Sequence, residues 1–142
     1  MVKGKDNLNK KQNIKKGLEN LEIYKLSERL EIFIYKVTEK FPKDEKYRSV
    51  DQLRRSSSST TDNISESYNR YSYGDKINRM YIARGEAGET KAGMRKAFKK
   101  GFVSKKIATF VDEKYTELIK GINGYIRYLK SQDRNKKSGV KK

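Results

Sequence analysis

The residues with the clearest chemistry in this sequence are the lysines and arginines between residues 91 and 106. Ammonium and guanidinium groups neutralise phosphate oxygens, and the counterions that a nucleic acid then releases favour binding. The run predicts a track for RNA or DNA, although a merely solvated helix face would carry the same residue types. Its seven members are Lys91, Arg95, Lys96, Lys99, Lys100, Lys105 and Lys106.

Three arginines outside this run, Arg54, Arg55 and Arg70, are candidates for the same contacts. The planar guanidinium fork suits a phosphate, but it suits a carboxylate equally well. Arg54 and Arg55, together with Arg84, therefore have a second interpretation, in which they form ion pairs between helices or between subunits.

Tyrosines beside Arg70 offer a different kind of contact. Tyr68, Tyr71 and Tyr73 surround it in the sequence, and tyrosine next to arginine can stack on the bases of single-stranded RNA. Packing in a loop or in a subunit interface is the alternative, since tyrosine is common there.

Catalytic chemistry has little support. Glu86 and Glu89 share one helix face, as carboxylates do in bundle sites that hold two metals, but such sites also need a Glu-x-x-His motif. The chain has no histidine and no cysteine, which excludes Ser-His-Asp and Cys-His nucleophiles, ordinary zinc sites and disulfides. We therefore expect no enzymatic activity and no cofactor.

The overall charge agrees with a polyanionic partner. The 142 residues include 35 lysines and arginines against 18 acidic residues, a net charge of +17. Residues 1–19 contribute +4 and residues 130–142 contribute +5, so the body between them is itself basic. A field of this sign attracts nucleic acid and repels basic partners. Basic tails that only aid solubility are the alternative.

Two further classes of protein are not expected. No apolar run approaches the roughly 18 residues that a membrane span needs. The basic N-terminus also lacks the apolar region of a secretory signal. We expect a cytoplasmic bacterial protein with no membrane contact.

Helices must position these side chains, because apolar residues recur every three or four positions. The first helix is predicted over residues 20–41 and ends at Pro42, the only proline of the chain, since the proline ring cannot continue the hydrogen-bond ladder. Its predicted inner face consists of Ile23, Leu26, Leu30, Phe33, Ile34, Val37 and Phe41.

The second helix is predicted from near Asp44 and contains six hydroxyl residues in succession, 56–61. Small side chains let a neighbouring helix come close, and their hydroxyl groups can bond to the carbonyl four residues earlier. A serine-rich linker is the competing interpretation. However, a linker has no reason to keep Leu53 and Ile64 in phase. The predicted inner positions are Val50, Leu53, Ser57, Thr60, Ile64 and Tyr68.

The third helix is predicted over residues 75–99 and the fourth from Ser104 to about residue 131. Gly101 and Ser104 are suited to cap the two helices at their junction. Glycine within a helix costs about 1 kcal/mol relative to alanine, so Gly85, Gly88 and Gly93 suggest close contact with the second helix. The predicted inner positions are Ile77, Met80, Tyr81, Gly85, Gly88, Ala92, Arg95 and Phe98 in the third helix, and Ile107, Val111, Tyr115, Leu118, Ile122, Tyr125, Ile126 and Leu129 in the fourth.

The predicted fold is all-α, an up-down-up-down antiparallel four-helix bundle in a single domain. The bundle covers residues 20–131, between a basic disordered arm at 1–19 and a basic disordered tail at 132–142. The low apolar fraction of 34 % suggests that subunits bury part of the surface between them.

Five short motifs in order resemble a known family. They are Phe41-Pro42-Lys43-Asp44-Glu45-Lys46-Tyr47, Gln52-Leu53-Arg54-Arg55-Ser56, Asn63-Ile64-Ser65-Glu66, Tyr81-Ile82-Ala83-Arg84-Gly85 and Ile126-Arg127-Tyr128-Leu129. The sequence is similar to the bacterial four-helix-bundle proteins encoded in intervening sequences of 23S rRNA genes. It departs from them where the family has Ala-Ala-Val-Ser-Ile-Pro-Ala. Residues 56–62 stand there, with Thr61 at the proline position, and Ser67 stands at a family glycine.

The resemblance implies a bundle that assembles into a ring, typically a pentamer, with no known enzymatic activity. The related accessory proteins of diversity-generating retroelements are basic pentamers that bind a reverse transcriptase and its template RNA. We therefore expect a non-enzymatic, oligomeric nucleic-acid-binding protein that is RNA-associated or accessory to a reverse transcriptase. The alternatives are an oligomeric scaffold for an acidic protein partner and, with least support, a nuclease.

Overall fold

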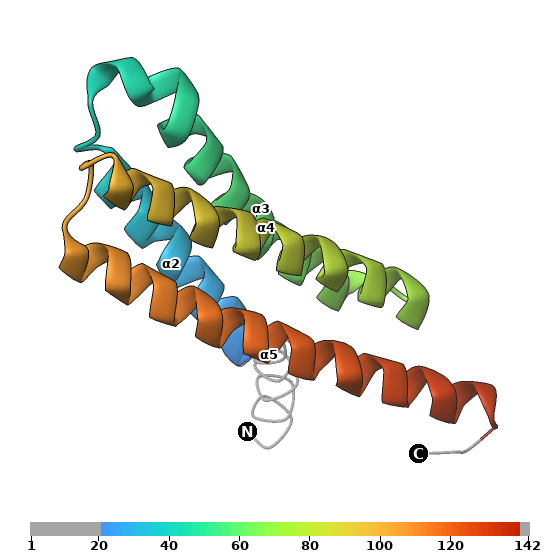
Figure 1. Ribbon diagram of the computed structural model, residues 1–142. Coiled ribbons are helices and arrows are strands. Elements are labelled where there is room, and N and C mark those ends of the chain that lie inside the picture. Colours follow the sequence, from blue (N-terminus) through green and yellow to red (C-terminus); the bar gives the residue numbers. More distant parts are fainter. Residues whose placement is uncertain (1–20, 140–142) are drawn as a thin grey trace, which may run out of the picture.

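The computed structural model describes residues 21–139 of the chain, and within that range it contains helices and no strand. The four main helices pack together as a bundle (Figure 1). They are α2 (Glu22–Thr38), α3 (Asp51–Asn69), α4 (Tyr73–Lys99) and α5 (Lys105–Lys137), with two short turns, η1 (Lys43–Glu45) and η2 (Lys46–Val50), before α3. The predicted arm at 1–19 lies outside the described residues.

The first predicted helix is shorter than expected, and its inner face is rotated. α2 ends at Thr38, and Phe41 is buried beyond its end. Leu26, Phe33 and Val37 are only partly buried. The prediction counted only apolar residues, whereas two hydroxyl residues belong to the buried face because their side chains bond inside the protein. The buried residues of α2 are Ile23, Ser27, Leu30, Ile34 and Thr38.

The segment between α2 and α3 changes direction in two short turns. A 3-10 turn follows Pro42, and a single π-helical turn follows it. Within the π turn Arg48 leaves helical geometry, with φ −118° and ψ −106°. The buried side chain of Glu45 accepts hydrogen bonds from the backbone N–H of Ser49 at 3.4 Å and from its hydroxyl at 3.1 Å. This cap fixes where the turn begins.

The hydroxyl run is helical, as predicted, and the linker interpretation is wrong. α3 is continuous through residues 56–61, including Thr61 at the family's proline position. Ser56 lies 2.7 Å from the Thr90 hydroxyl of α4, and Thr61 lies 2.8 Å from the Ser27 hydroxyl of α2. A buried hydroxyl without a hydrogen-bond partner costs free energy. Because these four hydroxyl groups bond to one another in pairs, they can be buried without that cost.

The inner face predicted for α4 is confirmed at Ile77 and Met80 and is wrong beyond them. Gly85 is exposed, and Cβ atoms built at Gly85 and Gly88 would meet nothing within 4 Å. Only Gly93 permits a close approach among the three, since a Cβ there would lie 2.8 Å from Leu53 Cδ2 of α3. Small residues do meet between α3 and α4, but on α4 they are mainly alanine and threonine. The buried residues of α4 are Ile77, Met80, Ala83, Ala87, Thr90, Met94 and Ala97.

The junction between α4 and α5 forms as predicted. Gly101 has a positive φ of 83°, and the N–H of Phe102 donates to the carbonyl of Ala97 at 2.9 Å, which ends α4 in a Schellman motif. The Ser104 hydroxyl accepts from the N–H of Ile107 at 3.2 Å and begins α5.

α5 confirms most of its predicted inner face, although Ile107 and Tyr125 are only partly buried. It also continues to Lys137 instead of ending near residue 131. At Gly121, a Cβ atom would lie 2.5 Å from Ile23 Cγ2, so this glycine is where α2 reaches α5. The buried residues are Val111, Tyr115, Leu118, Ile122, Ile126 and Leu129.

The bundle has two ends, which are built from different connections. The loop end contains η1, η2, the last turns of α4, the 100–104 loop and the first turn of α5. The ring centroids of Phe41 and Phe102 are 5.4 Å apart there and tie the α2–α3 segment to the α4–α5 loop. The turn end contains the 70–72 turn between α3 and α4 and the C-terminal part of α5 (Figure 1).

Candidate nucleic-acid interface

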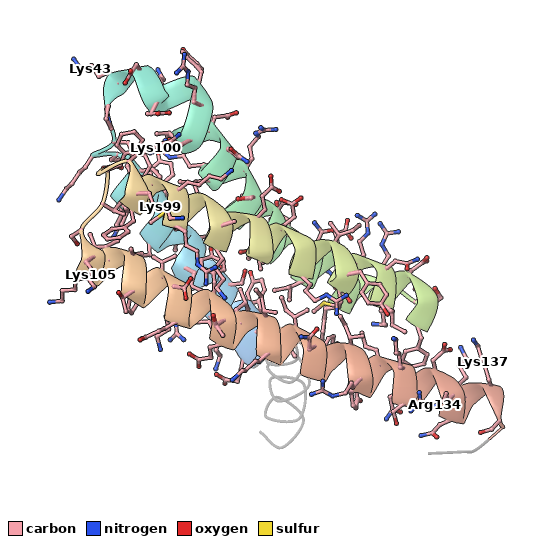
Figure 2. The ribbon with its side chains drawn as sticks, in the orientation of Figure 1. Lys43, Lys99, Lys100, Lys105, Arg134 and Lys137 are labelled. Carbon is pink, nitrogen blue, oxygen red and sulfur yellow. The ribbon has the colours of Figure 1, made fainter. Side chains whose placement is uncertain are left out.

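The loop end brings together most of the predicted basic run. Lys96 and Lys99 lie in the last turn of α4, and Lys100 follows as its C-cap. Lys105 and Lys106 are the first two residues of α5. All five side chains are exposed, and Figure 2 shows Lys99, Lys100 and Lys105 at this one end. The reversal of the chain at Gly101 places the two sets of lysines next to each other.

Sequence reasoning missed the second source of positive charge at the loop end. The η1 and η2 turns carry Lys43, Lys46 and Arg48, all exposed, and Figure 2 shows Lys43 at the same end of the bundle as Lys99, Lys100 and Lys105. A cleft of about 440 Å³ lies between the η1–η2 and α3 segment and the C-terminal part of α4, with Arg48, Lys96 and Lys100 among its lining residues. The order of the helices could have indicated that the η1–η2 cations lie at this end. When helices alternate in direction, the connection between the first and second helices and the connection between the third and fourth lie at the same end of a bundle.

Local helix stability does not explain the lysines that begin α5. A helix N-terminus carries partial positive charge, so cations there are unfavourable and acidic residues are favourable. The first turn of α5 holds Lys105 and Lys106 and no acidic residue. By contrast, Lys96 and Lys99 lie at the C-terminus of α4, where the helix dipole favours them. The whole segment from 91 to 111 contains no acidic residue.

Arg95 is the exception within the run. Its Nε donates to Asp112 Oδ1 at 2.7 Å across α4 and α5. This hydrogen bond holds the pKa of Asp112 below its usual range. Lys91 is half-buried. Arg95 is therefore held by a carboxylate of the bundle, and Lys91 is less exposed than the five lysines at the loop end.

Arg54 is taken up by the contact between α2 and α3. Its Nε donates to the Thr38 hydroxyl at 3.0 Å, one terminal nitrogen donates to the Tyr35 carbonyl at 3.2 Å, and the guanidinium lies 3.9 Å from the centroid of the Tyr35 ring. The expected ion pair between helices is replaced by neutral acceptors. Arg55 is exposed and pairs with Asp51 at 3.1 Å within α3.

Arg70 is separated from the other candidates. It is the C-cap of α3 at the turn end and pairs with Glu66 at 3.6 Å. Of the neighbouring tyrosines, Tyr73 packs against the core, Tyr68 has Lys76 Nζ 5.9 Å from its ring centroid, and Tyr71 is fully exposed. Among these tyrosines only Tyr71 presents a fully exposed ring to a partner.

The acidic pair on α4 does not form a metal cluster. Burial, followed by the nearby Glu89 carboxylate, raises the pKa of Glu86. Gln52 Nε2 donates to Glu89 Oε1 at 3.2 Å, so the second carboxylate is tied to α3. Between residues 21 and 139 no group of three potential metal ligands of the Asp, Glu, His or Cys type gathers.

No helix in that range is long and apolar enough to cross a bilayer.

A fold comparison finds a similar solved structure. It is a crystal structure of a protein with unknown function from the S23 ribosomal protein family of Bacteroides thetaiotaomicron VPI-5482, with a TM-score of 0.69 and 23 % sequence identity. The match covers 74 % of this chain and 95 % of that one. At this identity the likeness establishes the fold. A search of curated proteins found no match.

A comparison with models of protein families finds one family that the sequence matches over most of its length. Residues 19–124 match the model for the 23S rRNA-intervening sequence protein. That range runs from just before α2 into α5 and covers most of the chain. The first four of the five ordered motifs lie within the matched region, and the chain belongs to the 23S rRNA-intervening sequence protein family.

Proposed function

We propose that this protein is a non-enzymatic nucleic-acid-binding protein that contacts phosphates with the loop end of its bundle. One observation carries the proposal: Lys96, Lys99, Lys100, Lys105 and Lys106 share this end, and within residues 21–139 none of them forms an ion pair. Lys105 and Lys106 oppose the dipole of their own helix, so a partner outside the chain accounts for them better than the fold does.

A phosphate backbone fits this surface better than an acidic protein does. The end of α4, the start of α5 and the η1–η2 segment all contribute lysines to the loop end. Their flexible ammonium groups suit a regular row of phosphates. An acidic protein partner, the second candidate, would instead need carboxylates placed against particular lysines. Within the nucleic-acid proposal, RNA is the favoured class, and a reverse transcriptase is a candidate partner because of the resemblance to retroelement accessory proteins.

The test is the salt dependence of binding. A fluorescently labelled 20-nucleotide RNA, the corresponding DNA duplex and polyglutamate are titrated with the protein between 50 and 300 mM salt. Five phosphate contacts predict a slope of about −3.5 to −4.5 in a plot of log affinity against log salt. Binding of neither nucleic acid at 50 mM salt would rule the proposal out. Preference for polyglutamate would favour the acidic protein partner.

We also propose that the protein assembles with copies of itself, as a pentameric ring of bundles whose helices alternate up and down. A groove of about 370 Å³ between α2 and α3 supports assembly. Ile32 and Tyr35 lie beside it and are about half exposed, which is unusual for large apolar side chains. Glu31, Lys36 and Arg54 give the groove both signs of charge, so a second copy, which also carries both signs, suits it better than a purely acidic or basic partner.

Light scattering tests this assembly. We expect an oligomeric mass at micromolar concentration and a shift towards monomer for Ile32→Glu, because a charge placed in an apolar contact is costly to desolvate. Ile82→Glu, on an exposed isoleucine of α4, is the matched control and should keep the wild-type mass. A monomeric wild-type protein would rule out the assembly without affecting the proposed nucleic-acid surface.

A further inference from the structure

Tyr47 is the least explained aromatic residue at the loop end. It lies in the π-helical turn η2, and 84 % of its surface is exposed. Its own neighbour Lys46 has Nζ 5.4 Å from the ring centroid, and Arg48 follows in the sequence. A large ring exposed to this extent adds little to the core, so its packing does not explain why a tyrosine stands there.

The cleft beside Tyr47 has the composition of a site for a small charged group. Its volume of about 440 Å³ is in the range of ligand pockets. Leu53, Gly93 and Ala97 line it as apolar residues, and its charged lining has four cations, Arg48, Arg55, Lys96 and Lys100, against three carboxylates, Glu45, Asp51 and Glu89. Asp51 pairs with Arg55, and the other two carboxylates accept hydrogen bonds from Ser49 and Gln52. Within residues 21–139, Arg48, Lys96 and Lys100 are the lining cations that form no ion pair. Gly93 contributes to the shape of the cleft, since a side chain there would press on Leu53.

We infer that Tyr47 and this cleft hold an unpaired nucleotide of single-stranded RNA, an inference that rests on the proposed nucleic-acid function. The base stacks on the Tyr47 ring, and the adjoining phosphates lie against Arg48 and Lys100. An aromatic ring surrounded by cations is the usual arrangement for single strands, because every base presents a flat face while the backbone presents charge. A base inside a duplex is already stacked on both sides and cannot reach the ring.

The experiment compares Tyr47→Ala with two matched variants. Tyr47→Phe keeps the ring and removes the hydroxyl. Tyr71→Ala removes the fully exposed tyrosine of the turn end, which lies outside the cleft. Affinities are measured for a labelled 12-nucleotide single-stranded RNA and for a duplex RNA of the same length. Light scattering and circular dichroism are recorded for each variant.

We expect Tyr47→Ala to weaken single-strand binding about tenfold, as the loss of one stacked base would. Duplex binding should change less than twofold, and Tyr47→Phe and Tyr71→Ala should resemble the wild type. The slope of the salt dependence should stay unchanged, because no charge is lost. A 2-aminopurine in the RNA should be quenched at saturating wild-type protein and less quenched with Tyr47→Ala.

Several results would overturn the inference. One is an equal loss of single-strand and duplex affinity, and another is a loss with Tyr71→Ala but not with Tyr47→Ala. A lower oligomeric mass for Tyr47→Ala would make the residue a subunit contact instead. If the wild type binds RNA with the expected salt slope but Tyr47→Ala has no effect, only the stacking site fails. If the wild type binds no nucleic acid, the proposed function fails as well.

Discussion

The loop end and the turn end of the bundle both carry many cations, but at the turn end some of them, Lys76, Arg70 and Lys137, have partners inside the protein. At the turn end, Lys76 Nζ donates to the carbonyls of Tyr68 at 3.0 Å and Ser67 at 3.4 Å. Arg70 pairs with Glu66 at 3.6 Å. At the loop end, the lysines that flank the α4–α5 junction form no ion pair with any residue of the 21–139 segment.

Comparing Lys76 with Lys105 and Lys106 separates a cation that serves the fold from cations that remain accessible. Lys76 satisfies carbonyls at the C-terminus of α3, where a helix leaves acceptors without partners and favours positive charge. Lys105 and Lys106 lie at the opposite kind of helix end, and between residues 21 and 139 neither side chain donates to a helix terminus. A basic residue is thus informative about binding only after its internal partners are known.

Reversing charge at the two ends should give the largest contrast. Changing Lys96, Lys99, Lys100, Lys105 and Lys106 to glutamate should weaken RNA binding by on the order of a hundredfold at 50 mM salt and flatten the salt slope, because phosphate contacts are lost. The control makes the same change of charge at five exposed turn-end cations: Arg127, Lys130, Arg134, Lys136 and Lys137.

This control variant should lose less than about tenfold in RNA affinity. It lowers the net positive charge of the protein, and therefore its long-range attraction for RNA, but keeps the loop-end lysines. Fluorescence anisotropy with a labelled single-stranded RNA measures both variants. Equal losses would mean that net charge alone governs binding and that the two ends do not differ.

Removing a hydrogen bond at the turn end should lower stability. The fully buried Ser67 donates its hydroxyl to the Lys76 carbonyl at 2.7 Å, so Ser67→Ala should reduce the free energy of unfolding by about 1 kcal/mol. Urea denaturation followed by circular dichroism measures the change. Ser138→Ala, on the exposed C-cap of α5, should have no comparable effect. RNA affinity should be unchanged in both variants, and a loss of binding with Ser67→Ala would contradict the distinction between the ends.

Loop-end lysines should show the opposite relation between stability and binding. Lys105→Glu and Lys106→Glu should each raise the free energy of unfolding by roughly 0.3–1 kcal/mol, because an acidic residue complements the start of α5, while each weakens RNA binding. Glutamine at the same positions separates the loss of positive charge from the gain of negative charge. A drop in stability for both glutamate variants would show that these lysines do serve the fold.

The smallest effect concerns Arg95 and Asp112, the ion pair across α4 and α5. The hydrogen bond from Arg95 lowers the pKa of Asp112 in the folded state. The pair therefore adds stability above the unfolded pKa of the aspartate, and this contribution is lost as the pH falls through the lower folded value. Because both groups are partly or largely exposed, the contribution is modest.

Denaturation midpoints of the wild type and Asp112→Asn should differ at pH 7 and converge under acid conditions. Glu117→Gln, which breaks an exposed pair within α5, is the control and should follow the wild type more closely. A difference that persists at the lowest pH would mean that Asp112 acts through something other than its charge.

How much of the fold could be predicted depended on the chemistry of each inner face. α5 was predicted well because its buried positions carry large apolar residues such as Val111 and Leu118 at helical spacing. α4 was predicted correctly at Ile77 and Met80 but not beyond them, because small residues such as Ala83 and Ala87 form its inner face while equally small residues such as Gly85 lie on other faces. Ser27 and Thr38 were missed on α2 for the same reason, since hydroxyl burial depends on partners from elsewhere in the chain.

The sequence by itself determined the four helices, the capping at Gly101 and Ser104, the family and the basic run at 91–106. Such features follow from local hydrogen bonding and from periods of three to four residues. Only the tertiary structure decided that Lys43 and Arg48 join the run, that Arg54 is taken up by Tyr35 and Thr38, and that Arg70 lies at the other end. Helix packing sets which distant segments share an end, and it acts between residues that no local pattern connects.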